Sequence, residues 1–115
     1  MKREKTFERT VNDLIRKYES TFREHGYEIY NRTDYMFGDI EIYETKSKHT
    51  RHGFEEKEIK YRDVKAKIVF REFDKSGSIW TYGPTGFEET LYTIGEEWET
   101  ETGGKVEMTE YEKRL

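Results

Sequence analysis

Two histidines stand three residues apart in the stretch KSKHTRHG, residues 46–53. His49 and His52 at this spacing could ligate one metal ion if the stretch were helical. The stretch has the composition of a loop, Gly53 ends it, and no nearby Asp or Glu completes a recognisable ligand set. We therefore expect no metal site and no cofactor.

No other pattern of residues fixes a catalytic chemistry. The chain has no cysteine, which excludes a thiolate nucleophile, a thiolate zinc site and a disulfide scaffold. Carboxylate pairs such as Glu96 and Glu97 are too common, in a chain with 25 Asp and Glu residues, to indicate a general acid and base. The serines lack a nucleophile-elbow context, and the stretches GPTG and TGGK lack the spacing of a phosphate-binding loop. We assign no catalytic residue and favour a non-enzymatic role.

The stretch 46–53 concentrates cations in a chain whose formal net charge is −4. It lies between Tyr43 and Phe54, and cations beside aromatic rings are the combination that holds phosphate backbones and stacks bases. The alternative is a polar connection between two strands that is merely solvated. The candidate residues of this basic loop are Lys46, Lys48, His49, Arg51 and His52.

Carboxylates dominate the last quarter of the chain. Residues 87–115 contain nine Asp or Glu against three Lys or Arg, whereas residues 44–72 contain six against nine. Rows of carboxylates can occupy a basic nucleic-acid groove on another protein by imitating the charge of DNA. The alternative is that the glutamates serve solubility and discourage edge-to-edge pairing of strands. The candidate acidic surface consists of Glu88, Glu89, Glu96, Glu97, Glu99 and Glu101.

The elements that position these residues begin with a helix. Apolar side chains recur at spacings of three and four from Phe7 to Phe22, which predicts an amphipathic helix from about Thr6 to His25. Thr6 is suited to the N-cap, and Gly26 to a left-handed C-cap.

Beyond the helix the pattern has period two and is rich in β-branched and aromatic residues. It predicts strands in YEIYNRT, YMFGDIEIYETK, RDVKAKIVFREF and SIWTY. The stretch DKSG is expected to turn the third strand into the fourth, because Gly77 can take a positive φ. Residues 44–58 have the composition of a long polar loop.

Residues 86–95 allow two interpretations. Thr85 and Glu88 have the capping-box spacing of a helix start. We favour a strand, because strand-forming residues follow and Gly95 would interrupt a helix. We also expect a final hairpin within WETETGGKVEMTEY that turns at Gly103 and Gly104.

Together these elements predict a single α+β domain, residues 1–115, with the N-terminal amphipathic helix packed on a five- to six-stranded, mostly antiparallel sheet. Only 32% of the residues are hydrophobic, but nine Tyr, seven Phe and two Trp supply large side chains for a core. No membrane span or targeting segment is recognisable, which predicts a cytoplasmic protein. Some aromatic residues could instead line a small-ligand pocket between helix and sheet: Tyr30, Tyr35, Phe37, Trp80, Tyr82, Tyr92 and Trp98.

The order of the elements is similar to that of a known group of proteins. A leading amphipathic helix, the stretch FGDIEIYETKSKH, a long polar loop and the strand KAKIVF resemble one group of Cas9 inhibitors. The chain as a whole, short, cysteine-free and rich in Tyr and Glu, resembles the anti-CRISPR proteins that phages make against host defences. The resemblance covers about half of the chain, rests on element order and the pair Phe37 and Gly38, and carries over no site residue. It implies a non-enzymatic protein that binds a bacterial nuclease and blocks its guide or DNA groove.

We therefore expect a binding protein or inhibitor that engages a protein or nucleoprotein partner through charged surfaces. The resemblance implies a Cas nuclease as that partner and the host cytoplasm as the location. The alternatives are a nucleic-acid-binding module that uses residues 46–53 directly, and a small-ligand-binding domain.

Overall fold

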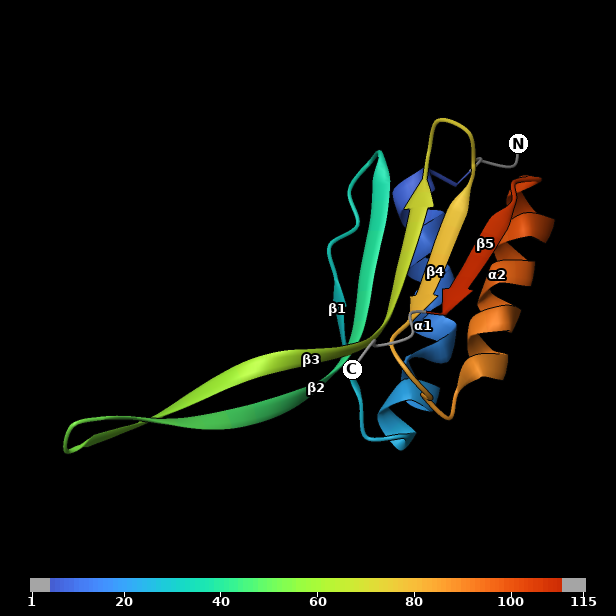
Figure 1. The fold of residues 1–115 in the computed structure, drawn as a ribbon. Helices are drawn as coiled ribbons and strands as arrows, with labels where there is room; N and C mark the ends of the chain where they lie inside the picture. Colours follow the sequence, from blue (N-terminus) through green and yellow to red (C-terminus); the bar gives the residue numbers. More distant parts are fainter. Residues whose placement is uncertain (1–4, 111–115) are drawn as a thin grey trace.

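The structure, a computed structural model, has two helices and one five-stranded sheet (Figure 1). It describes residues 5–110, so both ends of the expected domain 1–115 lie outside the described residues. The strands are β1 (Glu28–Asn31), β2 (Phe37–His52), β3 (Glu55–Arg71), β4 (Gly77–Thr81) and β5 (Val106–Glu110). They are hydrogen-bonded in the order β1-β2-β3-β4-β5, and all neighbours are antiparallel except β4 and β5. The predicted α+β class with a mostly antiparallel sheet is confirmed.

Helix α1 (Phe7–Glu24) occupies the predicted position. Thr6 caps it, because its side-chain oxygen accepts a backbone N–H of the first turn at 3.2 Å. At the other end Gly26 has a φ of +88°, and the N–H of Tyr27 donates to the carbonyl of Phe22. This pattern satisfies a carbonyl of the last turn and ends the helix.

Helix α2 (Glu88–Thr102) replaces the strand expected over residues 86–95, so that prediction is wrong. The two residues of the expected capping box bond the turn that leads into the helix: the Thr85 hydroxyl accepts the N–H of Phe87, and the Glu88 carboxylate accepts the N–H of Thr85 at 2.8 Å. The N-cap position itself is Phe87, which has no side-chain cap bond. The buried residues of the helix recur at helical spacing, and Gly95 is among them. A Cβ at Gly95 would lie 3.3 Å from a methyl of Val106, so this glycine lets the helix approach β5.

The expected hairpin at Gly103 and Gly104 is also wrong. Gly103 is the left-handed C-cap of α2, with a φ of +75°. Gly104 packs on the β3–β4 turn, where an added Cβ would lie 1.8 Å from the carbonyl oxygen of Lys75. The chain then enters β5, which pairs in parallel with β4. A parallel pair needs a crossover connection, and α2 supplies it.

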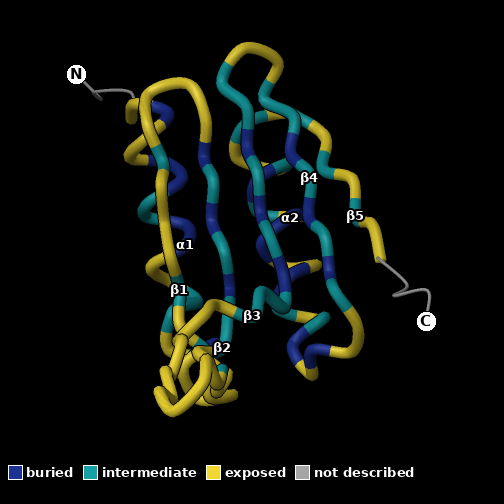
Figure 2. Tube along the Cα trace, turned by 60° about the vertical axis from the view of Figure 1, so that its left-hand side comes forward, coloured by how far each residue is buried: buried dark blue, intermediate teal, exposed yellow. Residues whose placement is uncertain are grey.

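The core lies between the two helices and one face of the sheet (Figure 2). Trp98 of α2 is fully buried and stacks on Phe70 of β3, with 4.1 Å between the ring centroids. Its indole N–H donates to the carbonyl of Lys75 at 2.8 Å, which satisfies the polar atom of the ring. Within residues 5–110, neither helix is long and apolar enough to cross a membrane.

Candidate binding surface

β2 and β3 continue far beyond the rest of the sheet. β1 pairs only with residues 40–43 of β2, and β4 only with residues 66–70 of β3. Past these positions β2 and β3 stay paired with each other as far as His52 and Glu55, without a third strand among the described residues. We call residues 44–63 the β-arm. It corrects the expectation of a long loop over residues 44–58, and it gives the molecule a long axis of 66 Å against 29 and 27 Å in the other directions (Figure 1).

A β-bulge lies where the β-arm leaves the sheet. Ile42 pairs with Ala66 but Tyr43 pairs with Val64, so Lys65 is an extra residue in β3. Such a bulge bends the strand and increases its twist. Both helices cover one face of the sheet, and the arm projects away from the helices (Figure 1, Figure 2).

Gly53 and Phe54 form the two-residue turn at the tip of the arm, since His52 pairs with Glu55. Gly53 has a φ of +62°, as the first central residue of a type II′ turn requires. This turn matches the twist of the flanking strands and does not call for an aromatic residue. The Phe54 side chain is nevertheless fully exposed, at 103%.

The half of the arm next to the body is basic. Residues 45–48 and 59–62 contain four Lys or Arg and no Asp or Glu, and we call them the cationic belt. Successive side chains of a strand point to opposite faces, so the two lysines of β2 lie on one face of the belt and Lys60 and Arg62 on the other. The face with the β2 lysines also carries Ile59 and Tyr61, which are about half exposed.

The outer half of the arm, residues 49–58, contains three Glu against two Lys or Arg, together with two His. Three of its basic side chains lie directly opposite carboxylates in the ladder, whereas Lys57 lies opposite Thr50. The pairs are His49 with Glu58, Arg51 with Glu56, and His52 with Glu55. The predicted basic loop is therefore divided: Lys46 and Lys48 belong to the cationic belt, and the other three residues face glutamates.

The histidine spacing does not bring two metal ligands together. His49 and His52 lie in an extended strand at positions of opposite parity, so their rings point to opposite faces of the arm. Among residues 5–110 no three His, Asp or Glu side chains gather in a way that could hold a metal ion.

A cluster of rings and charges joins the root of the arm to the sheet. The guanidinium of Arg62 lies over the ring of Tyr30, 4.4 Å from its centroid, and 3.8 Å from the carboxylate of Glu41. Arg32 lies over the same ring at 5.2 Å and bridges Glu41 and Asp39 at 3.5 and 3.0 Å. Cations on the face of an aromatic ring are attracted by its quadrupole. The cluster therefore restrains the arm against the edge of the sheet.

Asp63 is the second anchor at the root. Its carboxylate lies 2.6 Å from the ammonium of Lys46 and 2.9 Å from that of Lys65. The hydrogen bonds from Lys46 and Lys65 lower the pKa of Asp63 to about 2, because they stabilise the ionised form. One belt lysine is thus partly neutralised at the root.

The predicted acidic surface is divided by the fold into structural and exposed carboxylates. The Glu88 carboxylate accepts the backbone N–H groups of Thr85 and Gly86 in the turn before α2, and the bond from Thr85 lowers the pKa of Glu88. Glu97 accepts the hydroxyl of Tyr18 at 2.5 Å, and Glu99 accepts the N–H of Val106 at 3.0 Å. The remaining three are exposed: Glu89, Glu96 and Glu101.

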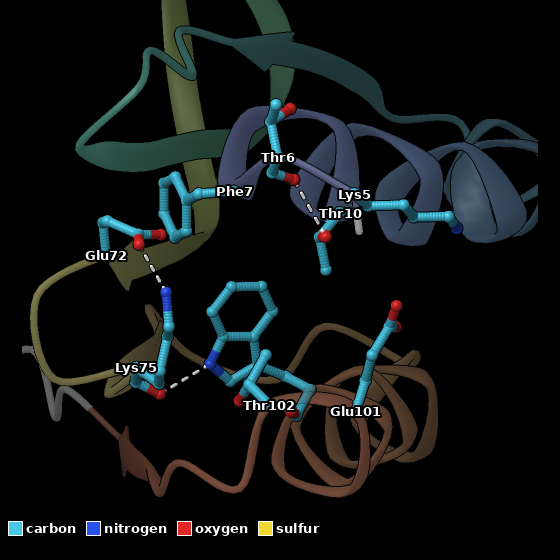
Figure 3. A pocket seen from close by; sticks show the side chains of 9 residues that line it. Lys5, Thr6, Phe7, Thr10, Glu72, Lys75, Glu101 and Thr102 are labelled. Carbon is cyan, nitrogen blue, oxygen red and sulfur yellow. Dashed lines mark hydrogen bonds and ion pairs between the residues drawn. The ribbon is translucent and has the colours of Figure 1, made fainter. Parts of the chain in front are cut away.

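The aromatic residues considered for a ligand pocket do not come together. Trp98 is in the core, whereas Tyr35 and Tyr92 are 75% and 57% exposed. One open cleft among the described residues lies between the start of α1, the β3–β4 turn and the end of α2 (Figure 3). It has a volume of about 540 Å³, and its Lys75 and Glu72 are paired with each other at 2.5 Å.

Sequence reasoning missed the contribution of Ile59 and Tyr61 to this surface. The available signal was the pair Gly53 and Phe54 between two segments of similar length and polarity, which a hairpin interpretation would have joined.

Comparison with protein-family models, with curated proteins and with solved structures returned no match.

Proposed function

We propose that this is a non-enzymatic binding protein whose β-arm engages its partner. The observation that carries the proposal is that residues 44–63 contain no buried side chain, while they display Phe54, Ile59 and Tyr61 to solvent. A two-stranded ribbon is at best marginally stable alone in water. These apolar side chains add nothing to the core, but an exposed aromatic surrounded by charged residues is the usual anatomy of an interface anchor.

The proposed partner is a protein or nucleoprotein, and a Cas nuclease with its guide RNA is the first defined partner to test. The charge layout supports this choice. Helix α2 has six Glu and no Lys or Arg, and it lies on the body, whereas the cationic belt lies on the arm that projects away from it (Figure 1). A nucleoprotein presents both a basic protein groove and an anionic nucleic acid, so it can match both signs at once.

The test is a pull-down from bacterial lysate with the tagged protein, with and without nuclease treatment, followed by mass spectrometry. The decisive variant replaces residues 45–62 by Asn-Gly, a dipeptide that favours a two-residue hairpin turn, and so keeps Asp63 but removes the arm. We expect one specific protein to be retained by the wild type after nuclease treatment and lost with the arm-shortened variant. Retention of the same protein by both forms would contradict the proposal.

A second variant tests the acidic surface without touching the core. Glu89→Gln with Glu96→Gln removes two exposed carboxylates, whereas changing Glu97 or Glu99 would break hydrogen bonds of the fold. If α2 contacts a basic groove, this variant weakens capture. For the Cas partner the same variants are added to a purified Cas9–guide RNA complex, and cleavage of its target DNA is followed. Full cleavage in the presence of excess wild-type protein excludes that partner.

A further inference from the structure

We infer that the cationic belt binds double-stranded DNA, with the two-stranded ribbon lying on its edge in the major groove. This inference rests on the proposed role of the arm as the contact element and names the chemistry of what the arm contacts. It is carried by the placement of the belt cations on both faces of one isolated ribbon.

The belt has positive charge that the protein itself does not neutralise. Lys46 is bound to Asp63, and Arg62 approaches Glu41 at 3.8 Å. No ion pair joins Lys48 or Lys60 to any residue between 5 and 110, and both are exposed. Solvated lysines of this kind gain affinity for a phosphate backbone chiefly through the counterions that the nucleic acid releases.

The two-sided arrangement favours a groove over a flat anionic surface. A groove of duplex DNA has a phosphate backbone along each wall, so a ribbon on its edge meets negative charge on both faces. The ribbon with its side chains is about 10 Å thick, which fits the major groove of about 12 Å and exceeds the minor groove of about 6 Å. A flat acidic protein surface would engage the cations of one face only.

The length and surroundings of the belt agree with this placement. Four residue pairs span about 13 Å, which is close to the rise of four base pairs. The outer edges of the arm strands have no neighbouring strand among the described residues, so the free backbone N–H and C=O groups of the strand that enters the groove would face the base edges. Helix α2, which carries six Glu, lies on the body and away from the arm (Figure 1), so its charge is kept at a distance from the proposed contact.

The test measures fluorescence anisotropy of labelled nucleic acid with the full chain. The probes are a mixed-sequence DNA duplex of about 20 base pairs, one of its single strands, and an RNA duplex of the same length, whose major groove is too narrow for the ribbon. The belt variant is Lys48→Ala with Lys60→Ala. The matched control is Arg16→Ala with Lys105→Ala, which removes the same charge from exposed positions outside the arm.

With Lys48 and Lys60 as the two cations free to contact phosphates, we expect log K to fall with log salt at a slope of about −1.8, so that affinity for the DNA duplex drops about 12-fold between 50 and 200 mM salt. The belt variant removes both free cations, so its slope should fall to near zero. The control variant should keep the slope, although its more negative net charge can weaken the affinity at every salt concentration. The DNA duplex should bind tighter than the single strand and the RNA duplex.

Three results would overturn the inference. They are absence of binding to the DNA duplex at 50 mM salt, an equal loss with the belt and control variants, and equal affinity for the three probes. Any of these results would leave the proposed function intact if a protein is still captured through the arm after nuclease treatment. The belt would then contact an acidic surface of that protein rather than DNA. If the wild type and the arm-shortened variant capture the same proteins, the proposed function itself is contradicted.

Discussion

The guanidinium of Arg62 lies over the ring of Tyr30, with 4.4 Å between its central carbon and the ring centroid. Arg62 belongs to the β-arm, and Tyr30 belongs to β1 at the edge of the sheet. The contact therefore spans the bulge at which the arm leaves the body. It converts an otherwise isolated ribbon into an element with a defined root.

Replacing Arg62 by Ala should loosen this root. We expect the free energy of unfolding to fall by about 0.5–1 kcal/mol, the range of a partly exposed cation–π contact, and amide exchange of the root residues to become faster. Urea unfolding and hydrogen exchange measure the two effects. Arg62→Lys is the control that keeps the charge and loses the planar stacking. Unchanged exchange in the Ala variant would show that the ring contact does not hold the arm.

Shortening the arm should leave the body folded. Residues 45–62 carry none of the buried side chains, so their replacement by Asn-Gly should change the free energy of unfolding by no more than about 1 kcal/mol. Thermal unfolding, followed by circular dichroism, measures the difference in stability between the shortened protein and the wild type. A loss of several kcal/mol would mean that the arm is part of the folding unit, and the capture experiment would then use the belt variant instead.

Asp63 should titrate far below an ordinary aspartate. Its folded pKa is about 2, against an ordinary 3.8, because Lys46 and Lys65 donate to the ionised carboxylate. A lowered carboxyl pKa contributes stability that is complete above the unfolded pKa and is lost as the pH falls through the folded value, so the window lies between about pH 4 and pH 2. NMR titration of the side-chain carboxyl carbon measures the midpoint directly. Lys46→Ala should raise it, and a midpoint near 3.8 in the wild type would refute the anchor.

The hydrogen bond between Tyr18 and Glu97 should be detectable as a raised titration midpoint of the Tyr18 phenol. It raises the pKa of Tyr18 to about 12 and lowers the pKa of Glu97. The phenol is neutral when it donates, so this contribution to stability is complete below about pH 10 and is lost as the pH rises through about 12. Phenolate absorbance near 295 nm follows the titration, and Glu97→Gln should move the Tyr18 midpoint back towards 10. Tyr18→Phe identifies the signal by removing it.

Local patterns predicted the elements whose signals are local. The stripe from Phe7 to Phe22 could be read as α1 because a helix with one buried face repeats its apolar residues every three or four positions. The same holds for the inner part of β3, where the buried Ala66, Ile68 and Phe70 alternate with the half-buried Lys67 and Val69. The charge layout, with a basic middle and an acidic end, was equally readable.

Helix α2 shows where local signals conflict. The capping box of Thr85 and Glu88 indicated a helix, while strand propensities and Gly95 indicated a strand. Packing decided between them, because the helix buries Leu91, Ile94 and Trp98 against the sheet, and Gly95 serves the approach to β5. Propensity is a weak prior that burial of an apolar face overrides.

The sequence by itself determined α1, the inner strands, the place of the β3–β4 turn and the separation of charge. The expected positive φ at Gly77 is wrong, because Lys75 takes it, with a φ of +57°, and Gly77 is the first residue of β4. Only the tertiary structure decided that residues 44–58 are strand rather than loop, that β5 runs parallel to β4, and that Glu97 and Glu99 are used inside the fold. The physical reason is that alternation is readable only where one face of a strand is buried. Both faces of the β-arm are exposed to solvent, so its residues do not alternate between apolar and polar. The pairing of two distant strands is also not visible in a local sequence pattern.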